Sequence, residues 1–127
     1  MRINILGVGF DNVTMEQAVA EGVRLTDTPG AHYVVTPNPE IVEVCREDPG
    51  AMAAVNGADL VLADGIGVVY GAKLLGTPLK GRAPGIEFAQ RLMGRMAQNG
   101  KSLFLLGAKP GVAEKAAERL REQYPGL

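Results

Sequence analysis

The sequence lacks the residues on which several kinds of site depend. It contains no tryptophan, one histidine and one cysteine. Cys45 has no partner for an internal disulfide, and neither a Cys/His cluster nor an Asp-x-Asp pair of metal-binding spacing occurs. These absences favour a protein of a reducing cytoplasm that has no tightly bound metal.

Long apolar runs and strong charge are also missing. No apolar stretch approaches the roughly 20 residues of a membrane-spanning helix, and the N-terminus lacks the pattern of a signal peptide. The net charge is -1, and no run of Lys or Arg exceeds two residues, so nothing suggests a nucleic-acid interface. With 127 residues, of which 46% are hydrophobic and 21% charged, the chain has the size and composition of one globular domain, predicted over 1–127.

Strand-like and helix-like segments alternate along the chain. This alternation predicts an α/β fold with a Rossmann-like, mostly parallel sheet flanked by helices. The expected strands are 2–8, 32–36, 59–63 and 102–107; the expected helices follow a capping box at Thr14 and Gln17, begin at Pro39, cover 51–58, 66–75 and 86–99, and follow the Pro110-Gly111 turn.

The carboxyl ends of parallel strands lie on one sheet edge, where ligands of open α/β sheets bind. Three predicted strands end in the loops "TPNPE", "ADGIG" and "GAKPG". That edge would carry Thr36, Asn38, Asp64 and a glycine-bearing helix start at 107–111. The final "PGL" stands where another strand is expected, which predicts a sheet truncated at the C-terminus and a fragment or shortened form of a longer domain.

Asp64 in "LVLADGIGVV" has two readings. It can cap the helix expected near Ile66, the commoner role of an aspartate in such a turn. It can instead be a general base at the sheet edge, where Gly65 and Gly67 allow the backbone or a ligand to approach closely. A helix N-terminus stabilises the charged carboxylate and weakens it as a base, whereas burial acts in the opposite direction.

The other edge residues are equally open to two readings. Thr36 and Asn38 fit ordinary turn chemistry, but their hydroxyl and amide groups can also bind a sugar or an acetamido group. Lys80 and Arg82 fit a solvated loop or a diphosphate site. "GAKPG" could hold a phosphate on helix N–H groups, although it lacks the P-loop and dinucleotide signatures. His32 and Cys45 are predicted to be structural.

Four segments in the same order resemble the WecG/TagA/CpsF glycosyltransferases, a family of inverting enzymes. They are "VVTPNPEIV", "ADLVLADGIGVVYGAKLLG", "RAPGIEF" and "LFLLGAKPGVAEKAAERLREQYPGL", and together they cover nearly the whole chain. Within the family, the resemblance is to the TagA type. Members are roughly twice as long as this chain, and the further part helps to complete the site and meets the membrane.

The resemblance implies roles for individual residues. Asp64 would be the general base. Thr36 and Asn38 would contact the sugar or position the acceptor, and Arg82 would lie near the diphosphate. The turn at 107–111 would bind the UDP end; the substrate-binding residues expected in all are Thr36, Asn38, Gly65, Arg82, Gly107 and Gly111.

The implied reaction moves N-acetylmannosamine from a UDP-sugar to the 4-hydroxyl of undecaprenyl-diphosphate-linked GlcNAc, in wall teichoic acid linkage-unit synthesis. It implies no cofactor, no metal, and a peripheral place on the cytoplasmic face of the bacterial membrane. Exposed apolar surface on an incomplete fold would favour a homo-oligomer. The alternatives are another UDP-sugar such as ManNAc uronic acid, an inactive nucleotide-sugar-binding module, and a class I methyltransferase suggested by "VLADGIG".

Overall fold

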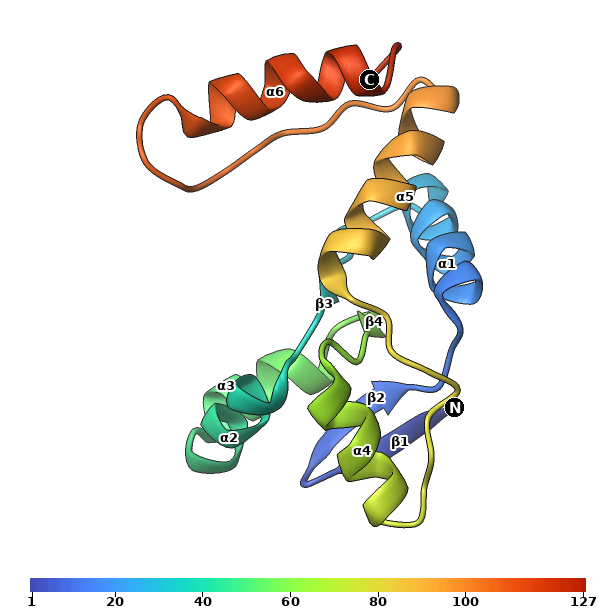
Figure 1. Ribbon diagram of the computed structural model, residues 1–127, viewed down its shortest axis with the longest axis vertical. Coiled ribbons are helices and arrows are strands. Elements are labelled where there is room, and N and C mark those ends of the chain that lie inside the picture. The colour runs from blue at the N-terminus through green and yellow to red at the C-terminus, as the bar shows by residue number, and fades with distance from the viewer. The chain divides into compact units, whose positions relative to one another are not determined.

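The computed structural model describes residues 1–127 and confirms the α/β class (Figure 1). The chain forms two compact units, Met1–Phe88 and Ala89–Leu127. The single domain expected over 1–127 stays a prediction. The elements are β1 (Arg2–Ile5), β2 (Val8–Asp11), α1 (Met15–Asp27), β3 (Val34–Val35), α2 (Pro39–Glu47), α3 (Pro49–Asn56), β4 (Leu60–Val61), α4 (Ile66–Leu74), α5 (Gly85–Gln98) and α6 (Val112–Gln123).

The N-terminal strand differs from the sequence prediction. Strand β1 ends at Ile5, and the chain returns as β2 to form an antiparallel hairpin, so the single strand expected over 2–8 is wrong. The reversal uses positive φ angles at Leu6 (51°) and Gly7 (96°). Glycine adopts such angles readily, but leucine seldom does, which is why the pattern gave no hairpin signal.

Strands β3 and β4 form the parallel pair on which the sequence argument depended. Val34 pairs with Leu60 and Val35 with Val61. The main-chain contact continues past both strands, because Asp64 N–H donates to the Pro37 carbonyl at 3.2 Å. The loops that follow the two strands therefore lie side by side, as predicted, although the parallel sheet itself is small.

The hydrophobic core of the first unit lies between the hairpin, β4 and the neighbouring helices. Helices α2 and α3 pack against each other (Figure 1). Cys45 is 2% exposed and belongs to this core, which confirms its structural reading. The largest fully buried side chains are those of Val8, Phe10, Pro37, Cys45, Val61 and Leu62.

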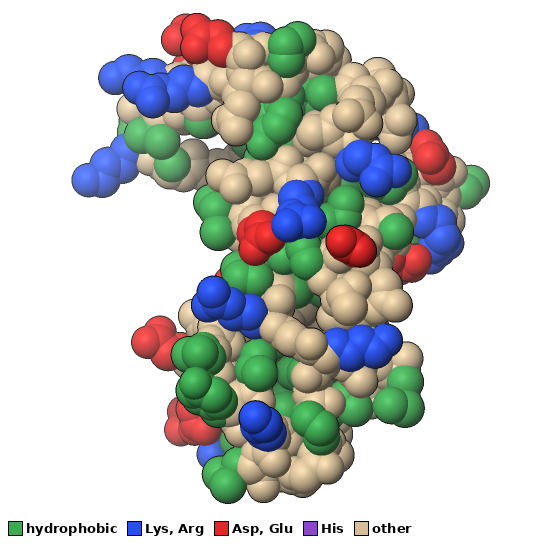
Figure 2. All heavy atoms as spheres, turned by 45° about the vertical axis from the view of Figure 1, so that its right-hand side comes forward, with side chains coloured by type: hydrophobic (Ala, Val, Ile, Leu, Met, Phe, Trp, Pro, Cys, Tyr) green, Lys and Arg blue, Asp and Glu red, His purple; other side chains and the backbone are tan.

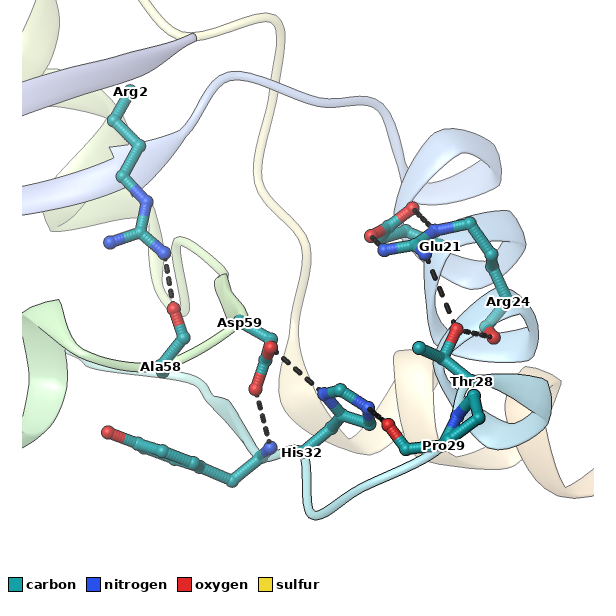
Figure 3. Close-up of polar contacts among 9 residues, drawn as sticks. Arg2, Glu21, Arg24, Thr28, Pro29, His32, Ala58 and Asp59 are labelled. Atoms are coloured by element: carbon teal, nitrogen blue, oxygen red, sulfur yellow. Dashed lines mark hydrogen bonds and ion pairs between the residues drawn. The ribbon is translucent and has the colours of Figure 1, made fainter.

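Two charged side chains fasten the hairpin to the segment before β4. Arg2 donates to the carbonyls of Asn56 and Ala58, the second of which is drawn in Figure 3, and its Nε lies 3.4 Å from Asp11 Oδ1. Asp11 Oδ2 in turn accepts the N–H of Val61 at 2.8 Å. We call Arg2 and Asp11 the polar clamp. It satisfies main-chain groups that no strand pairs.

His32 bridges the end of α1 and the start of β4. Its Nδ1 lies 3.1 Å from Asp59 Oδ1 and its Nε2 lies 3.1 Å from the Pro29 carbonyl oxygen (Figure 3). Asp59 Oδ2 also accepts the N–H of Tyr33. The hydrogen bond with Asp59 raises the pKa of His32. The pKa of Asp59 is lowered, first by the Tyr33 N–H and then by His32. His32 therefore has a structural role, as expected.

The second unit corrects the strand expected over 102–107. This segment is extended but pairs with no strand. It lies instead along α6, where Leu103, Leu105, Ala117 and Leu120 line a shared hollow. A strand exists only where another backbone supplies its hydrogen-bond partners, and the apolar pattern alone could not reveal that none is present.

Helix α4 is apolar on two sides. It buries Val68 and Ala72, whereas Ile66, Tyr70 and Leu74 are exposed. Figure 2 shows hydrophobic side chains at the surface of the molecule, interspersed with Lys and Arg. Neither α4 nor any other helix has the length and apolar character needed to traverse a bilayer.

Replacing Asp11 with alanine should lower the free energy of unfolding by about 1–3 kcal/mol, because it leaves the buried Val61 N–H without its acceptor. Urea denaturation measures the change. Glu43→Ala is the control, since Glu43 forms an exposed ion pair with Arg46 and should change stability by about 0–1 kcal/mol. Equal losses in the two variants would contradict the role of the clamp.

The His32–Asp59 pair should stabilise the fold over a limited pH range. The raised His32 pKa gives stability that is complete below its ordinary value of 6.5 and is lost as pH rises through the raised value. The lowered Asp59 pKa gives stability that is present above 3.8 and is lost as pH falls through the lowered value. Thermal melts of wild type and His32→Gln should therefore differ most near about pH 5. A difference that stays constant from about pH 5 to 8 would refute the pairing.

Candidate functional site

Three segments of the first unit meet beyond the carboxyl ends of β3 and β4. The Asp64 N–H donates to the Pro37 carbonyl at 3.2 Å, and the Ala83 N–H donates to the Ala63 carbonyl at 2.8 Å. The segments 36–39, 63–67 and 82–85 are thus linked through their backbones. We call this group the edge site. It contains five of the residues expected from the sequence: Thr36, Asn38, Asp64, Gly65 and Arg82.

Asp64 is half-buried, and its carboxylate faces the start of α5. Its Oδ2 accepts the N–H of Gly85, the first residue of that helix, at 3.4 Å. The capping reading for α4 is wrong, because the N-cap of α4 is Gly65 and no side chain caps that helix. Since the φ of Gly65 is 94°, the chain turns away from Asp64 before α4 begins. The Asp64 carboxylate therefore contacts the 82–85 segment and not the start of α4.

The glycines after Asp64 allow a close approach to the "PNP" loop. A Cβ atom at Gly67 would lie 2.8 Å from Pro39 Cγ, and one at Gly65 would lie 3.7 Å from Pro39 Cδ. Gly67 therefore has a packing reason to be glycine, and Gly65 has the conformational reason of its positive φ. These contacts hold the loop with Asp64 against the loop with Thr36.

Thr36 packs against Gly85, a residue that the sequence analysis did not select. A Cβ atom at Gly85 would lie 2.8 Å from Thr36 Oγ1, 3.1 Å from its Cγ2 and 3.2 Å from its Cβ. The available signal was a glycine at the first position of α5, where helix propensity gives no reason for one. The sequence placed Gly85 in the loop and began the helix at Ile86.

Asn38 and the loop cations have local partners. Asn38 caps α2, its Oδ1 accepting the Ile41 N–H at 2.9 Å, which is the turn role considered from sequence. Lys80 binds the first turn of α1, its Nζ lying 3.4 Å from Gln17 Oε1. Arg82 is exposed and directly precedes Ala83, whose backbone is bonded to the Asp64 loop. Of the two cations, Arg82 is the one beside the edge site.

The glycine-bearing turn at 107–111 belongs to the second unit. Gly107, Ala108 and Gly111 have positive φ angles of 118°, 64° and 87°. Gly111 is the N-cap of α6, and no side chain caps the helix; the Val112 N–H donates to the Lys109 carbonyl at 3.1 Å. Main-chain N–H groups at the start of a helix can bind an anion.

Metal-binding side chains do not cluster in the structure. No group of three or more His, Cys, Asp or Glu residues is arranged to hold a metal ion. Within the three segments of the edge site, the charged side chains are the Asp64 carboxylate and the Arg82 guanidinium.

The chain is similar to known proteins along almost its whole length. Residues 3–127 match the model of the glycosyl transferase WecG/TagA/CpsF family. The N-acetylglucosaminyldiphosphoundecaprenol N-acetyl-beta-D-mannosaminyltransferases of Staphylococcus aureus strains NCTC 8325 / PS 47 and COL are each 36% identical to it over 129 aligned positions. Each alignment covers 99% of this chain and 50% of the relative, so the chain spans about half the length of these relatives.

The match includes all four segments on which the sequence resemblance was based, and it confirms that resemblance. The chain therefore belongs to the WecG/TagA/CpsF family of glycosyl transferases.

Proposed function

We propose that the chain carries the acceptor-activating part of an inverting glycosyltransferase, with Asp64 as the general base. The observation that carries this proposal is the half-buried Asp64 carboxylate at the end of a parallel strand pair, beside Thr36, in a member of this family. Ligands of α/β proteins bind at this end of the strands.

The proposed reaction is a single displacement. Asp64 takes the proton of an acceptor hydroxyl while the hydroxyl oxygen forms a bond to the anomeric carbon of the donor sugar. The bond between that carbon and the diphosphate oxygen breaks on the opposite face, and UDP leaves with the electron pair. Attack from the opposite face inverts the anomeric centre.

Binding roles follow from the donors available at each position. Thr36 supplies a hydroxyl for the acceptor sugar, and Asn38 supplies its amide NH₂ group while its oxygen caps α2. Arg82 offers a planar, permanently charged guanidinium to the departing diphosphate. The uncapped start of α6, with Gly107 and Gly111, is proposed to hold the UDP phosphates on N–H groups. The proposed reaction uses no metal and no cofactor beyond the UDP-sugar.

The names of the Staphylococcus aureus relatives suggest the substrates. They describe transfer of N-acetyl-beta-D-mannosamine to N-acetylglucosaminyl-diphosphoundecaprenol. We propose the same acceptor here, with its 4-hydroxyl as nucleophile and UDP-ManNAc as donor, in wall teichoic acid linkage-unit synthesis. A lipid-linked acceptor places the reaction at the cytoplasmic face of the membrane, with the protein bound peripherally. Another UDP-sugar is the competing donor, and a panel of UDP-sugars in the assay below identifies the true one.

Asp64→Asn should reduce UDP release by about 10²–10⁴-fold, the usual contribution of a general base. The assay uses the protein at its natural length, UDP-ManNAc and a lipid-diphosphate-linked GlcNAc. Asp48→Asn is the matched control, because asparagine still caps α3 through its amide oxygen and should retain full turnover. Full activity in Asp64→Asn would exclude Asp64 as the base. Binding of UDP-sugar without turnover in wild type would indicate a binding module.

Arg82→Ala should lower kcat/KM about 10–100-fold, since a cation that stabilises the leaving diphosphate contributes about 1.5–3 kcal/mol. Steady-state kinetics of UDP release measure the effect. Lys80→Ala is the comparison, because Lys80 is bonded to α1 and should change kcat/KM about twofold or less. Equal losses of kcat/KM in both variants would contradict the proposed role of Arg82 at the leaving diphosphate.

A further inference from the structure

We infer that Gly85 is a positioning residue for Asp64 and Thr36, and that two separate properties of this glycine matter. Its main-chain N–H binds the Asp64 carboxylate, and its missing side chain leaves the space that Thr36 fills. The inference rests on the proposed function for its effect on turnover. The contacts of Gly85 with Asp64 and Thr36, and their effect on stability, do not depend on that function.

The first property concerns the direction of the Asp64 side chain. The Gly85 N–H donates to Oδ2 at 3.4 Å, so one carboxylate oxygen is held by the start of α5. The other oxygen, Oδ1, is the one that the proposed reaction uses to accept the proton of the acceptor hydroxyl. Hydrogen bonds of catalytic groups are often long without substrate and shorten in the complex, and this bond is expected to do the same.

The second property concerns Thr36. All three side-chain atoms of Thr36 would lie 2.8–3.2 Å from a Cβ at Gly85, a spacing below ordinary van der Waals contact. The same residue thus contacts both side chains of the proposed acceptor site. Because Gly85 contacts both, it holds the Asp64 and Thr36 side chains at a fixed separation beside the start of α5.

Gly85 has no other evident reason to be glycine. Its φ is outside the left-handed range, so alanine could adopt its conformation. It is the first residue of α5, where alanine would favour the helix and would also reduce the entropy of the unfolded chain. Secondary-structure energetics alone therefore predict that Gly85→Ala is neutral or stabilising. The positioning role predicts the opposite.

The matched control lies in the loop just before α5. Gly81 also lacks a positive φ, and a Cβ atom there would meet nothing within 4 Å. Gly81→Ala should therefore leave stability unchanged and kcat within about twofold of wild type. Any general effect of replacing glycine in this part of the chain appears in both variants, whereas the effect of crowding Thr36 appears only at Gly85.

The test compares Gly85→Ala with Gly85→Pro. Alanine should lower kcat about 10–100-fold with a smaller change in KM, because displacing Thr36 misaligns the acceptor against Asp64. Proline is tolerated at the first position of a helix but has no N–H, so it should lower kcat about tenfold further by removing the donor to Asp64. Steady-state UDP release by the natural-length protein gives both constants.

A double variant shows whether Gly85 acts through Thr36. Thr36→Ala removes Oγ1 and Cγ2, the two nearest atoms, so Gly85→Ala should cost little more in that background. Thermal melts supply a readout without activity: Gly85→Ala should lower the Tm, and Thr36→Ala/Gly85→Ala should recover it. The Gly85 amide resonance should also move in Asp64→Ala, which removes the acceptor of its hydrogen bond.

The outcomes separate the inference from the proposed function. If wild type turns over and both Gly85 variants behave like Gly81→Ala, the inference is wrong and the glycosyltransferase assignment stands. If wild type releases no UDP, the proposed function fails. The melts and the Gly85 amide resonance then decide the positioning role by themselves, and unchanged values in the variants would overturn it.

Discussion

The arrangement of the first unit depends on how the buried segment at β4 satisfies its main chain. Residues Leu60–Ala63 are at most 3% exposed, yet β4 pairs with only one strand. The remaining groups are bound by other segments: Val61 by the Asp11 carboxylate, and Ala63 by the N–H of Ala83. A buried backbone without such partners would be strongly disfavoured. This requirement draws the hairpin and the 82–85 segment onto β4.

The same requirement builds the edge site. The hydrogen bond from Ala83 to Ala63 places Gly85 within reach of Asp64, and the bond from Asp64 to Pro37 places Thr36 beside both. The site is therefore an extension of strand pairing into the loops that follow the strands. The proposed base role of Asp64 is supported by three features of this place: the carboxylate is half-buried, it accepts the Gly85 N–H, and Gly85 packs against Thr36.

Local patterns predicted much of this correctly. The capping box at Thr14 and Gln17 is present, α2 begins at Pro39, and two of the expected strand segments contain β3 and β4, which are parallel as expected of the sheet. These features depend on neighbouring residues or on apolar runs, so they are visible in sequence. The hairpin turn at Leu6 and the unpaired segment over 102–107 were not, because one uses a leucine in a rare conformation and the other depends on a distant strand.

The sequence by itself determined the family, the α/β class and the loops that follow β3 and β4, because these follow from ordered motifs and from the periodicity of apolar positions. Only the tertiary structure decided what the Asp64 carboxylate touches. Capping depends on residues that are close in the chain, so the sequence suggested that Asp64 caps α4, the next helix. The positive φ of Gly65 turns the backbone away from Asp64, and the carboxylate instead accepts the N–H of Gly85, which lies about twenty residues later in the chain.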